Sequence, residues 1–312
     1  MNTHAKRKRV PVHGVLLLDK PEGMSSTQAL AKAKWLLNAE KAGHTGTLDP
    51  FATGLLPLCF GEATKFASDL LDADKTYEAT IRLGVTTTTG DPEGEVLQAR
   101  DVNVQRAQIE SALDKFRGPI DQVPPMHSAL KRDGKPLYAY AREGKTLERE
   151  ARAVTIHELE LVSFSAPNIR IRVRCSKGTY IRVLGEDIGQ ALGTGGHLIS
   201  LRRVGVGNLL IAEAMTIDAL AALSEADRKN SLLPADSLLS ELIPVVLPPE
   251  LASRFMQGQR LALGREDGDF LSGRAGRVKV FSVTKTLLGV AHLSAEGMLQ
   301  PERLVSVSTF DK

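Results

Sequence analysis

One alternating run of residues constrains the fold of this chain more than any other stretch. Residues 168–175 read NIRIRVRC, in which isoleucine and valine alternate with arginine. Successive side chains of a strand point to opposite faces, so one face of this strand is apolar and the other is strongly basic. A glycine turn follows, and apolar residues then recur at helical spacing from Ile181 to Gly193. The run predicts a half-buried strand that leads into an amphipathic helix, with Arg182 in the first turn of that helix.

Similar patterns predict further elements along the chain. Residues 14–21 form a buried apolar run that ends at Pro21, and Ser25 and Gln28 then have the capping-box spacing of a helix start. Residues 75–84 alternate cleanly, which predicts a half-buried strand.

The segments between these elements are expected to be loops, turns and one helix. Residues 43–57 are interpreted as a glycine-broken loop, and residues 85–96 as turns. Residues 104–118 predict an amphipathic helix closed by Gly118.

The length of 312 residues favours two domains, and the sequence pattern changes near Pro244. Residues 210–244, before this change, are acidic and have the pattern of helices. The following residues predict a short helix, ELASRFMQG, and then short strands at 277–283, 286–293 and 303–308. A small β-rich C-terminal domain is therefore expected.

Charge and cysteine content limit the class of protein. The net charge of +3 is only mildly basic, which allows an anionic partner without requiring one. Cys59 and Cys175 lie in apolar runs and are expected to be buried thiols. Because no apolar run is long enough to span a bilayer and no signal peptide is recognisable, we expect a cytoplasmic protein without a membrane segment.

Two segments carry concentrated positive charge. Residues 1–10 include Lys6, Arg7, Lys8 and Arg9, and are interpreted as a flexible tail that is either simply solvated or contacts phosphates. Residues 131–152 hold seven basic and four acidic residues, with two tyrosines among them. This second segment fits either a protruding arm on nucleic acid or a charged helical hairpin.

The stretch GHTGTLDPFATGLLP, residues 43–57, places a carboxylate in a stiff and apolar setting. Pro50 drives Asp49 out of the helical region, and glycines on both sides allow tight turns. Partial burial would raise the pKa of Asp49 unless a cation compensates, and Arg182 is a candidate for that cation.

Simpler roles also fit these residues. Asp49 can be an acceptor of backbone hydrogen bonds, His44 a hydrogen-bonded loop residue, and Tyr77 a core residue. Motifs for nucleotide or metal binding are absent from the sequence, so no cofactor and no metal is expected.

Residues 43–57 closely resemble the catalytic loop of the TruB family of tRNA pseudouridine synthases. The likeness continues through LCFGEATKF, and four more stretches agree in order and spacing: GVLLLDKPEGMSS, DADKTYEATIRLG, MHSALKRDGKPLYAYAREG and CSKGTYIRVLGEDIG, the last followed by GGHLISLRR. Together they extend over residues 12–205, with a weaker likeness beyond.

The resemblance implies an α/β (α+β) fold with a mixed, mainly antiparallel central sheet and flanking helices, plus a small β-rich domain of the PUA type. The catalytic domain would span residues 11–243, with a basic, thumb-like insertion at 125–152. Residues 244–312 would form the PUA-like RNA-binding domain and touch the acceptor end of tRNA.

The resemblance also implies an isomerase that converts uridine 55 in the tRNA T-loop to pseudouridine, by base flipping and by cleavage and re-formation of the glycosidic bond. No cofactor, metal or obligate protein partner is implied. Asp49 would be the catalytic carboxylate, acting as a nucleophile or as a base. Arg182 would pair with it, and Tyr77 would stack on the uracil and assist deprotonation at carbon 5.

The resemblance assigns binding roles to further residues. Lys20, His44 and Leu201 would bind the target nucleotide. The expected RNA-binding residues are Lys131, Arg132, Lys135, Arg142 and Lys177. His127 departs from the family pattern, since an aromatic residue is common at this position.

Two other functions compete with this one. A non-catalytic RNA-binding protein would have no use for Asp49, Arg182 and Tyr77 together. A glycoside hydrolase would need a second carboxylate and stacking aromatics, yet aromatic residues are only 4% of the chain. An additional tRNA-folding role is a separate hypothesis, in which an Asp49→Asn variant still accelerates tRNA folding.

Overall fold

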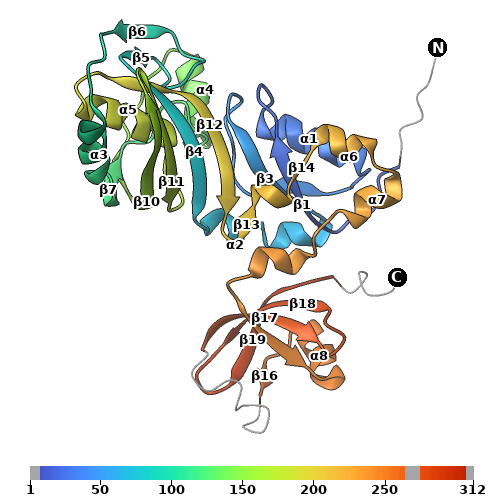
Figure 1. The fold of residues 1–312 in the computed structure, drawn as a ribbon. Coiled ribbons are helices and arrows are strands. Elements are labelled where there is room, and N and C mark those ends of the chain that lie inside the picture. Colours follow the sequence, from blue (N-terminus) through green and yellow to red (C-terminus); the bar gives the residue numbers. More distant parts are fainter. Residues whose placement is uncertain (1–7, 264–274, 307–312) are drawn as a thin grey trace, which may run out of the picture.

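The computed structural model describes residues 8–263 and 275–306. Within them the chain forms two units, a large one around a ten-stranded mixed sheet and a small one around a five-stranded sheet. Figure 1 shows the small unit below the large one, joined by the chain near η3 (Ala235–Leu239). The predicted fold class, a mixed sheet with helices plus a β-rich C-terminal unit, is confirmed.

The large sheet has the order β14-β1-β3-β12-β4-β11-β10-β7, with β2 beside β3 and β13 beside β12. Only the β1–β14 and β3–β12 pairs are parallel. Its strands are β1 Gly14–Lys20, β2 Ala42–His44, β3 Thr53–Phe60, β4 Lys75–Leu83, β7 Gly118–Gln122, β10 Arg152–Ser165, β11 Asn168–Cys175, β12 Gly196–Val206, β13 Leu209–Leu210 and β14 Met215–Thr216.

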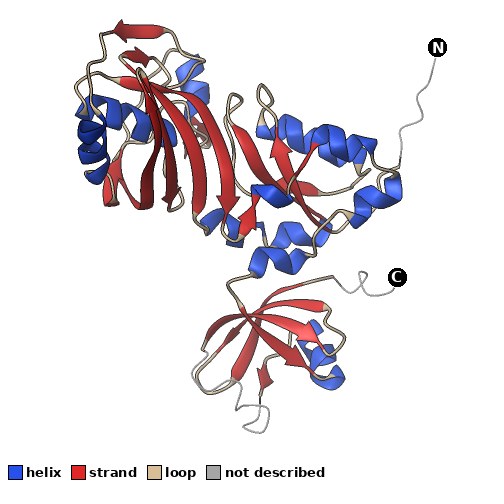
Figure 2. Cartoon of the chain, in the orientation of Figure 1, coloured by secondary structure: helices blue, strands red, loops and turns tan. Residues whose placement is uncertain are grey.

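Helices cover one face of the left half of this sheet, and the opposite face is open (Figure 2). Behind β4, β11 and β10 lie α3 and α5, while α1 and α6 lie at the β1–β14 end. The helices are α1 Ser26–Leu36, α2 Ala67–Asp72, α3 Arg106–Asp114, α4 Leu137–Arg142, α5 Ile181–Ala191, α6 Ile217–Ala222, α7 Glu225–Asn230 and α8 Pro249–Met256, with short 3-10 helices η1 Gly61–Lys65 and η2 Ile211–Glu213 besides η3.

The alternating strands predicted from the sequence are confirmed as β4 and β11, which pair with each other. The apolar residues of both strands pack against Leu184 and Ile188 of α5 in the main core. The predicted capping box also forms, since Ser25 and Gln28 bond reciprocally at the start of α1. Local periodicity was sufficient here because each element buries one face against the same core.

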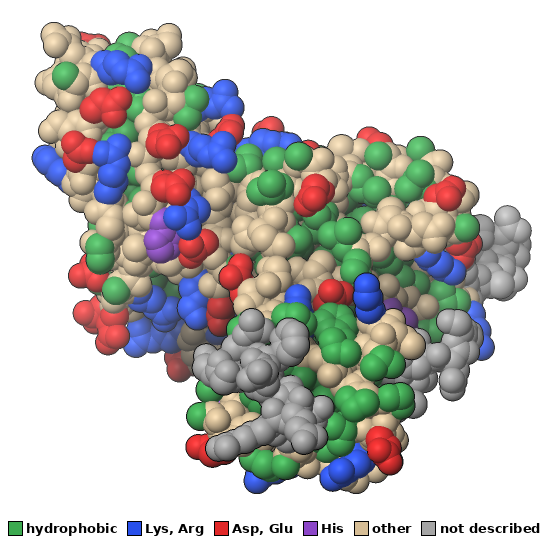
Figure 3. Space-filling view, turned by 60° about the horizontal axis from the view of Figure 1, so that its bottom comes forward, with side chains coloured by type: hydrophobic (Ala, Val, Ile, Leu, Met, Phe, Trp, Pro, Cys, Tyr) green, Lys and Arg blue, Asp and Glu red, His purple; other side chains and the backbone are tan. Residues whose placement is uncertain are grey.

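The basic face of β11 is charge-compensated, which its own sequence does not reveal. Arg170 and Arg172 pair with Glu78 at 2.6 and 3.8 Å, and Arg174 pairs with Asp74 and Glu158 at 3.2 and 2.9 Å. The acids come from β4, the segment before it, and β10. Figure 3 shows positive and negative side chains interspersed over the left part of the molecule, where this sheet is found.

The interpretation of residues 43–57 as one loop was wrong, because β3 begins at Thr53 and runs through the centre of the sheet. Pro57 is tolerated in this strand because of where it sits. One edge of β3 pairs with β1, and the other edge is shared by two strands. On that shared edge, residues 53–54 pair with β12 and residues 58–60 pair with β2. The missing N–H of Pro57 falls between these two pairings, so no ladder bond is lost.

Three other boundaries differ from expectation. The helix predicted over 104–118 spans only Arg106–Asp114, and Gly118 begins β7 instead. The strand predicted at 303–308 is β19, which spans Met298–Leu304, and residues 307–308 lie outside the described part of the chain. Of the predicted flexible tail, residues 1–7 are not described, whereas Lys8 and Arg9 are bonded to Asn38 and Lys34.

The small unit has the strand order β15-β17-β18-β19-β16 and its own core, which includes Phe255 of α8. It attaches to the large unit through apolar and polar contacts. Val290 and Val305 join the core of the large unit, and Arg277 pairs with Asp69 at 2.5 Å.

The remaining strands of the small unit are β15 Ile243–Leu247, β16 Leu261–Ala262, β17 Gly276–Ser282 and β18 Leu287–Leu293. Two small hairpins belong to the large unit: β5 Val85–Thr87 with β6 Val96–Ala99, and β8 Lys131–Arg132 with β9 Lys135–Pro136.

Both cysteines are buried free thiols, as predicted. No helix in the described residues combines the length and apolar character needed to cross a bilayer.

Candidate active site

The loop that carries Asp49 joins β2 to β3 and is held by the backbone on either side of the aspartate. Ser26 Oγ accepts a hydrogen bond from Leu48 N at 2.8 Å and donates one to Leu48 O. Gly23 N and Lys20 Nζ donate to Pro50 O, at 2.8 and 3.3 Å. Because the residues before and after Asp49 are both bonded to the β1–α1 connection, the carboxylate has a defined direction.

Asp49 meets Arg182, as the sequence had suggested. Asp49 Oδ2 lies 3.0 Å from Arg182 Nε, although the two residues are remote in sequence. The side chain of Arg182 is 5% exposed, whereas that of Asp49 is 35% exposed. The carboxylate is therefore the accessible half of the pair, and the guanidinium lies beneath it.

A second carboxylate, which sequence reasoning missed, contacts the same guanidinium. Asp91 Oδ2 lies 3.3 Å from Arg182 Nη1, and its side chain is only 4% exposed. Arg182 also donates to Thr89 O at 2.9 Å and to His127 O at 2.6 Å. Residues 85–96 had been interpreted only as turns, because nothing local indicates that Asp91 reaches an arginine on α5.

Burial dominates the electrostatics of this cluster. It raises the pKa of Asp49 above the ordinary value, opposed by the Arg182 charge, while Asp91 raises it further. Burial also lowers the pKa of Lys20 to about 8. Two carboxylates thus share one guanidinium, and Asp49 is the one that faces solvent.

Tyr77 lies on β4, on the core side of the sheet, directly opposite Arg203 of β12. Arg203 is 1% exposed and was not singled out from the sequence. Its Nε donates to Leu55 O at 2.7 Å, and its Nη2 donates to Gly46 O at 3.3 Å. Period-two alternation was the available signal, since Arg203 shares a strand face with the buried Leu201.

The other three predicted site residues occupy different environments. Lys20 is fully buried and donates to three backbone carbonyls, so it organises the loop and presents no free surface. Leu201 is 7% exposed and belongs to the main core. His44 is half-buried, and its Nδ1 has no hydrogen-bond partner among the described residues. Burial, together with the Arg203 charge, lowers the pKa of His44.

Four of the predicted RNA-binding residues lie on the insertion, and Lys177 lies in the turn before α5. Lys131 and Arg132 are exposed on the β8–β9 hairpin, and Arg132 donates to Glu148 O at 2.7 Å. Lys135 lies 4.6 Å from the Tyr140 ring, and Arg142 lies 5.3 Å from that of Tyr138. Lys177 is exposed and pairs with Asp72 at 2.8 Å.

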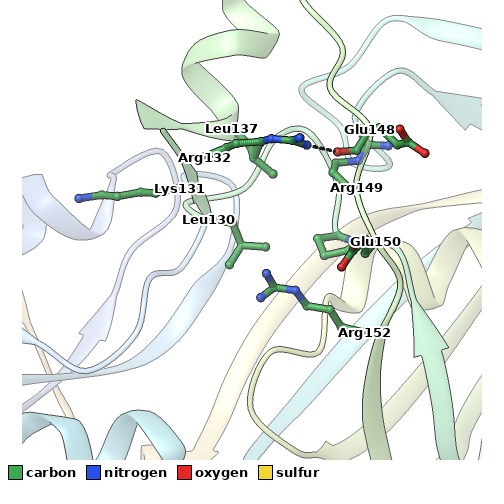
Figure 4. A pocket seen from close by; sticks show the side chains of 9 residues that line it. Leu130, Lys131, Arg132, Leu137, Glu148, Arg149, Glu150 and Arg152 are labelled. Carbon is green, nitrogen blue, oxygen red and sulfur yellow. Dashed lines mark hydrogen bonds between the residues drawn. The ribbon is translucent and has the colours of Figure 1, made fainter. Parts of the chain in front are cut away.

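The insertion is a β-hairpin followed by one short helix, so the helical-hairpin interpretation was wrong. Between the hairpin and residues 148–152 lies a cavity of about 290 Å³. Figure 4 shows Arg152 and Leu130 pointing toward one another across it, with Arg132 bonded to the segment at Glu148. In the described residues, no cluster of three or more His, Cys, Asp or Glu side chains could hold a metal ion.

Three families of known proteins match successive stretches of the chain. Residues 34–181 match the family described as "TruB family pseudouridylate synthase (N terminal domain)", and residues 182–250 match "tRNA pseudouridylate synthase B C-terminal domain". Residues 244–305 match "Pseudouridine synthase II TruB, C-terminal".

Named relatives extend over nearly the whole chain. It is 58% identical over 308 residues to tRNA pseudouridine synthase B of Burkholderia mallei (strain ATCC 23344), covering 98% of this chain and 99% of the relative. It is 57% identical over 308 residues to tRNA pseudouridine synthase B of Cupriavidus pinatubonensis, covering 97% and 98%. A chain in the solved structure "Crystal Structure of a Cbf5-Nop10-Gar1 Complex" matches with a TM-score of 0.72 at 26% identity, covering 94% of this chain and 84% of that chain.

The fold and the family matches together define a pseudouridine synthase. Within that class of isomerases, the chain belongs to the TruB family.

Proposed function

We propose that this protein isomerises a uridine of tRNA to pseudouridine, and that its target is uridine 55 in the T-loop. The observation that carries the proposal is the Asp49–Arg182 pair, in which a partly exposed carboxylate rests on a buried guanidinium at 3.0 Å. The names of the relatives support the reaction and the tRNA substrate.

The reaction breaks the bond between ribose C1′ and uracil N1, turns the uracil, and joins C1′ to uracil C5. The C5 proton then leaves, and its bonding electrons restore the ring double bond. Asp49 can supply an electron pair as a nucleophile toward the sugar or the ring, or as the base that removes a ribose proton. In either role Arg182 orients the carboxylate and stabilises its charge.

Tyr77 is proposed to stack on the flipped uracil and to assist removal of the C5 proton through its hydroxyl. His44 and Leu201 would help to hold the flipped nucleotide. Lys20 donates a hydrogen bond to the backbone oxygen of Pro50, directly after Asp49, and would act by fixing the position of the loop. Base flipping costs a few kcal/mol, and stacking on Tyr77 would offset part of that cost.

The insertion at 125–152 is proposed to close over the T-loop, with Lys131, Arg132, Lys135 and Arg142 contacting RNA, and Lys177 contacting it from beside α5. The proposed domains are a catalytic domain at 11–243 and a PUA-like domain at 244–312 that touches the acceptor end. We place the reaction in the cytoplasm and invoke no protein partner.

The test uses an unmodified tRNA transcript tritiated at C5 of its uridines, with chelator present. We expect the wild-type protein to release tritium equivalent to one uridine per tRNA. Asp49→Asn should bind tRNA with unchanged affinity and release none. Asp19→Asn is the matched control, because the Asp19 side chain points to the face of β1 opposite Lys20 and pairs with Arg202 at 2.7 Å.

Each rival function has its own signature in this experiment. Tight tRNA binding without tritium release by the wild-type protein would favour an RNA-binding protein. Release of free uracil would favour a glycoside hydrolase. Sequencing of the product places the modified uridine and so checks position 55.

A further inference from the structure

Gln122 carries a buried amide that the proposed reaction does not use. It lies at the end of β7, which is the last strand in the order of the large sheet, and it is only 2% exposed. Side chains alternate along a strand, so Gln122 shares its face with Ile120, which packs against the main core. A buried amide needs hydrogen-bond partners. The partners of Gln122 therefore show what it holds in place.

Both hydrogen bonds of Gln122 go to the backbone of Tyr180. Gln122 Oε1 accepts from Tyr180 N at 3.0 Å, and Gln122 Nε2 donates to Tyr180 O at 3.4 Å. Tyr180 is the N-cap of α5, and among the described residues its side chain makes no capping bond. Its carbonyl also accepts the first bond of the helix, from Leu184 N at 3.1 Å. The start of α5 is thus held from the side by β7, two residues before Arg182.

A second contact joins the segment after Gln122 to Arg182 itself. Arg182 Nη2 donates to His127 O at 2.6 Å. Between Gln122 and His127 lie Pro124 and Pro125, each of which fixes its own φ and favours an extended conformation in the residue before it. Residues 122–127 therefore form a stiff segment that is bonded to the first turn of α5 at both of its ends.

The stiff segment is also one root of the insertion at 125–152. Gln122 pairs with Arg152 between β7 and β10, so the two chain ends of the insertion meet beside it. Arg182, which the segment contacts, bonds Asp49 at 3.0 Å. One chain of contacts therefore runs from the base of the insertion, through the start of α5, to the proposed reacting carboxylate.

We propose that Gln122 is a positioning residue, which fixes the first turn of α5 against the base of the insertion and so holds the Arg182 guanidinium beneath Asp49. This inference rests on the proposed function. Gln122 acts through the backbone of Tyr180 and takes no part in proton or electron transfer. A misplacement of about 1 Å can cost a reaction about 10²-fold in rate, so a small shift of Arg182 is sufficient for an effect.

The first test measures the contact between Gln122 and Tyr180 without RNA. Amide hydrogen exchange of the full chain, read by NMR at Tyr180 N–H, reports the bond to Gln122 Oε1. Gln122→Leu removes both hydrogen bonds, and exchange at Tyr180 should accelerate by about tenfold or more. Gln190→Leu is the matched control, because Gln190 is exposed near the other end of the same helix, and it should leave exchange at Tyr180 unchanged.

Single-turnover kinetics with tRNA supply the second measurement. Gln122→Leu should lower the rate by about tenfold or more with little change in tRNA affinity, whereas Gln190→Leu should react like wild type. Should Gln122→Leu fail to fold by circular dichroism, Gln122→Asn takes its place, because its shorter amide cannot reach both Tyr180 atoms from the same backbone position. An unchanged rate in either folded variant of Gln122 would overturn the proposal.

The pH dependence of the rate separates positioning from a general loss of stability. Burial and the Asp91 charge raise the pKa of Asp49, whereas Arg182 and Lys20 lower it. A less closely held Arg182 should let the pKa of Asp49 rise, so the acid limb of the pH–rate profile of Gln122→Leu should move upward by about 0.5 pH unit. A protein that is merely less stable would keep the wild-type acid limb. A lower rate with an unmoved acid limb would therefore overturn the proposal.

Failure of the proposed function would look different. In that case the wild-type protein releases no tritium, while exchange at Tyr180 still depends on Gln122, and the role of Gln122 in the reaction falls together with the proposed function. Unchanged exchange at Tyr180 in folded Gln122→Leu would instead overturn the hold of Gln122 on α5, whatever the activity of the wild-type protein.

Discussion

Asp91 bonds Nη1 of the same Arg182 guanidinium whose Nε bonds Asp49, at 3.3 and 3.0 Å. Asp91 is 3% exposed and never reaches solvent itself, so its influence on a reaction must pass through Arg182 and through its own charge. The pair that the sequence suggested is therefore part of a three-residue network.

Asp91→Asn should lower activity and shift its pH dependence. The Asp91 charge raises the pKa of Asp49, so its removal should let Asp49 ionise at lower pH. Arg182 also loses its ion pair with Asp91, which helps to orient the guanidinium. The single-turnover rate should therefore fall by roughly tenfold or more. A pH–rate profile checks both effects, with Glu95→Gln, an exposed acid of the same hairpin, as the control. If the acid limb of the pH–rate profile stays at the wild-type pH in Asp91→Asn, the predicted effect of the Asp91 charge on the pKa of Asp49 is wrong.

Gly54→Ala should destabilise the protein and disable the site. Gly54 has φ +104°, and a Cβ there would lie 2.2 Å from Arg203 O, so β3 and β12 would have to separate. Overpacking of this kind costs typically about 1–3 kcal/mol, and strain at positive φ adds to it. Denaturant unfolding measures the loss. Gly43→Ala is the control, since the added carbon has no described atom within 4 Å beyond Gly43 and its two chain neighbours, and it should unfold like wild type.

Lys20→Met should cost more stability at high pH than at neutral pH. Burial lowers the pKa of Lys20 to about 8 in the folded protein, below its ordinary value of 10.5. Between these values the unfolded chain binds the extra proton, so the Lys20 contribution to stability rises as pH rises. Unfolding free energies of both proteins at pH 8 and pH 10 should diverge by roughly 1–3 kcal/mol. A constant difference would show that Lys20 keeps its charge in the fold.

Lys131→Gln should weaken tRNA binding through a phosphate contact. Lys131 is exposed on the β8–β9 hairpin. Loss of one phosphate contact should reduce the slope of log K against log salt by about 0.7–0.9. Binding isotherms at several salt concentrations measure it, with Lys229→Gln on α7 as the control. Equal slopes for wild type and Lys131→Gln would remove Lys131 from the RNA interface.

Strand β3 and the basic face of β11 are two features that the sequence alone did not predict correctly. Pro57 and Gly54 disguise a central strand, because a proline is acceptable only where its missing N–H faces a gap in the pairing, as Pro57 does on the side of β2 and β12. The arginines of β11 appear as a basic surface until Glu78 and Glu158 on the adjacent strands are seen to pair with them.

The sequence by itself determined the elements whose signals are local. Alternation defined β4 and β11, and glycine with helical spacing defined α5. Proline and glycine made the Asp49 loop stiff. The tertiary structure alone decided which polar groups meet, namely Asp91 with Arg182 and Arg203 with the backbone of Gly46 and Leu55. The physical reason is that an ion pair or hydrogen bond depends on distance through space, and here the sheet brings together strands that lie far apart along the chain.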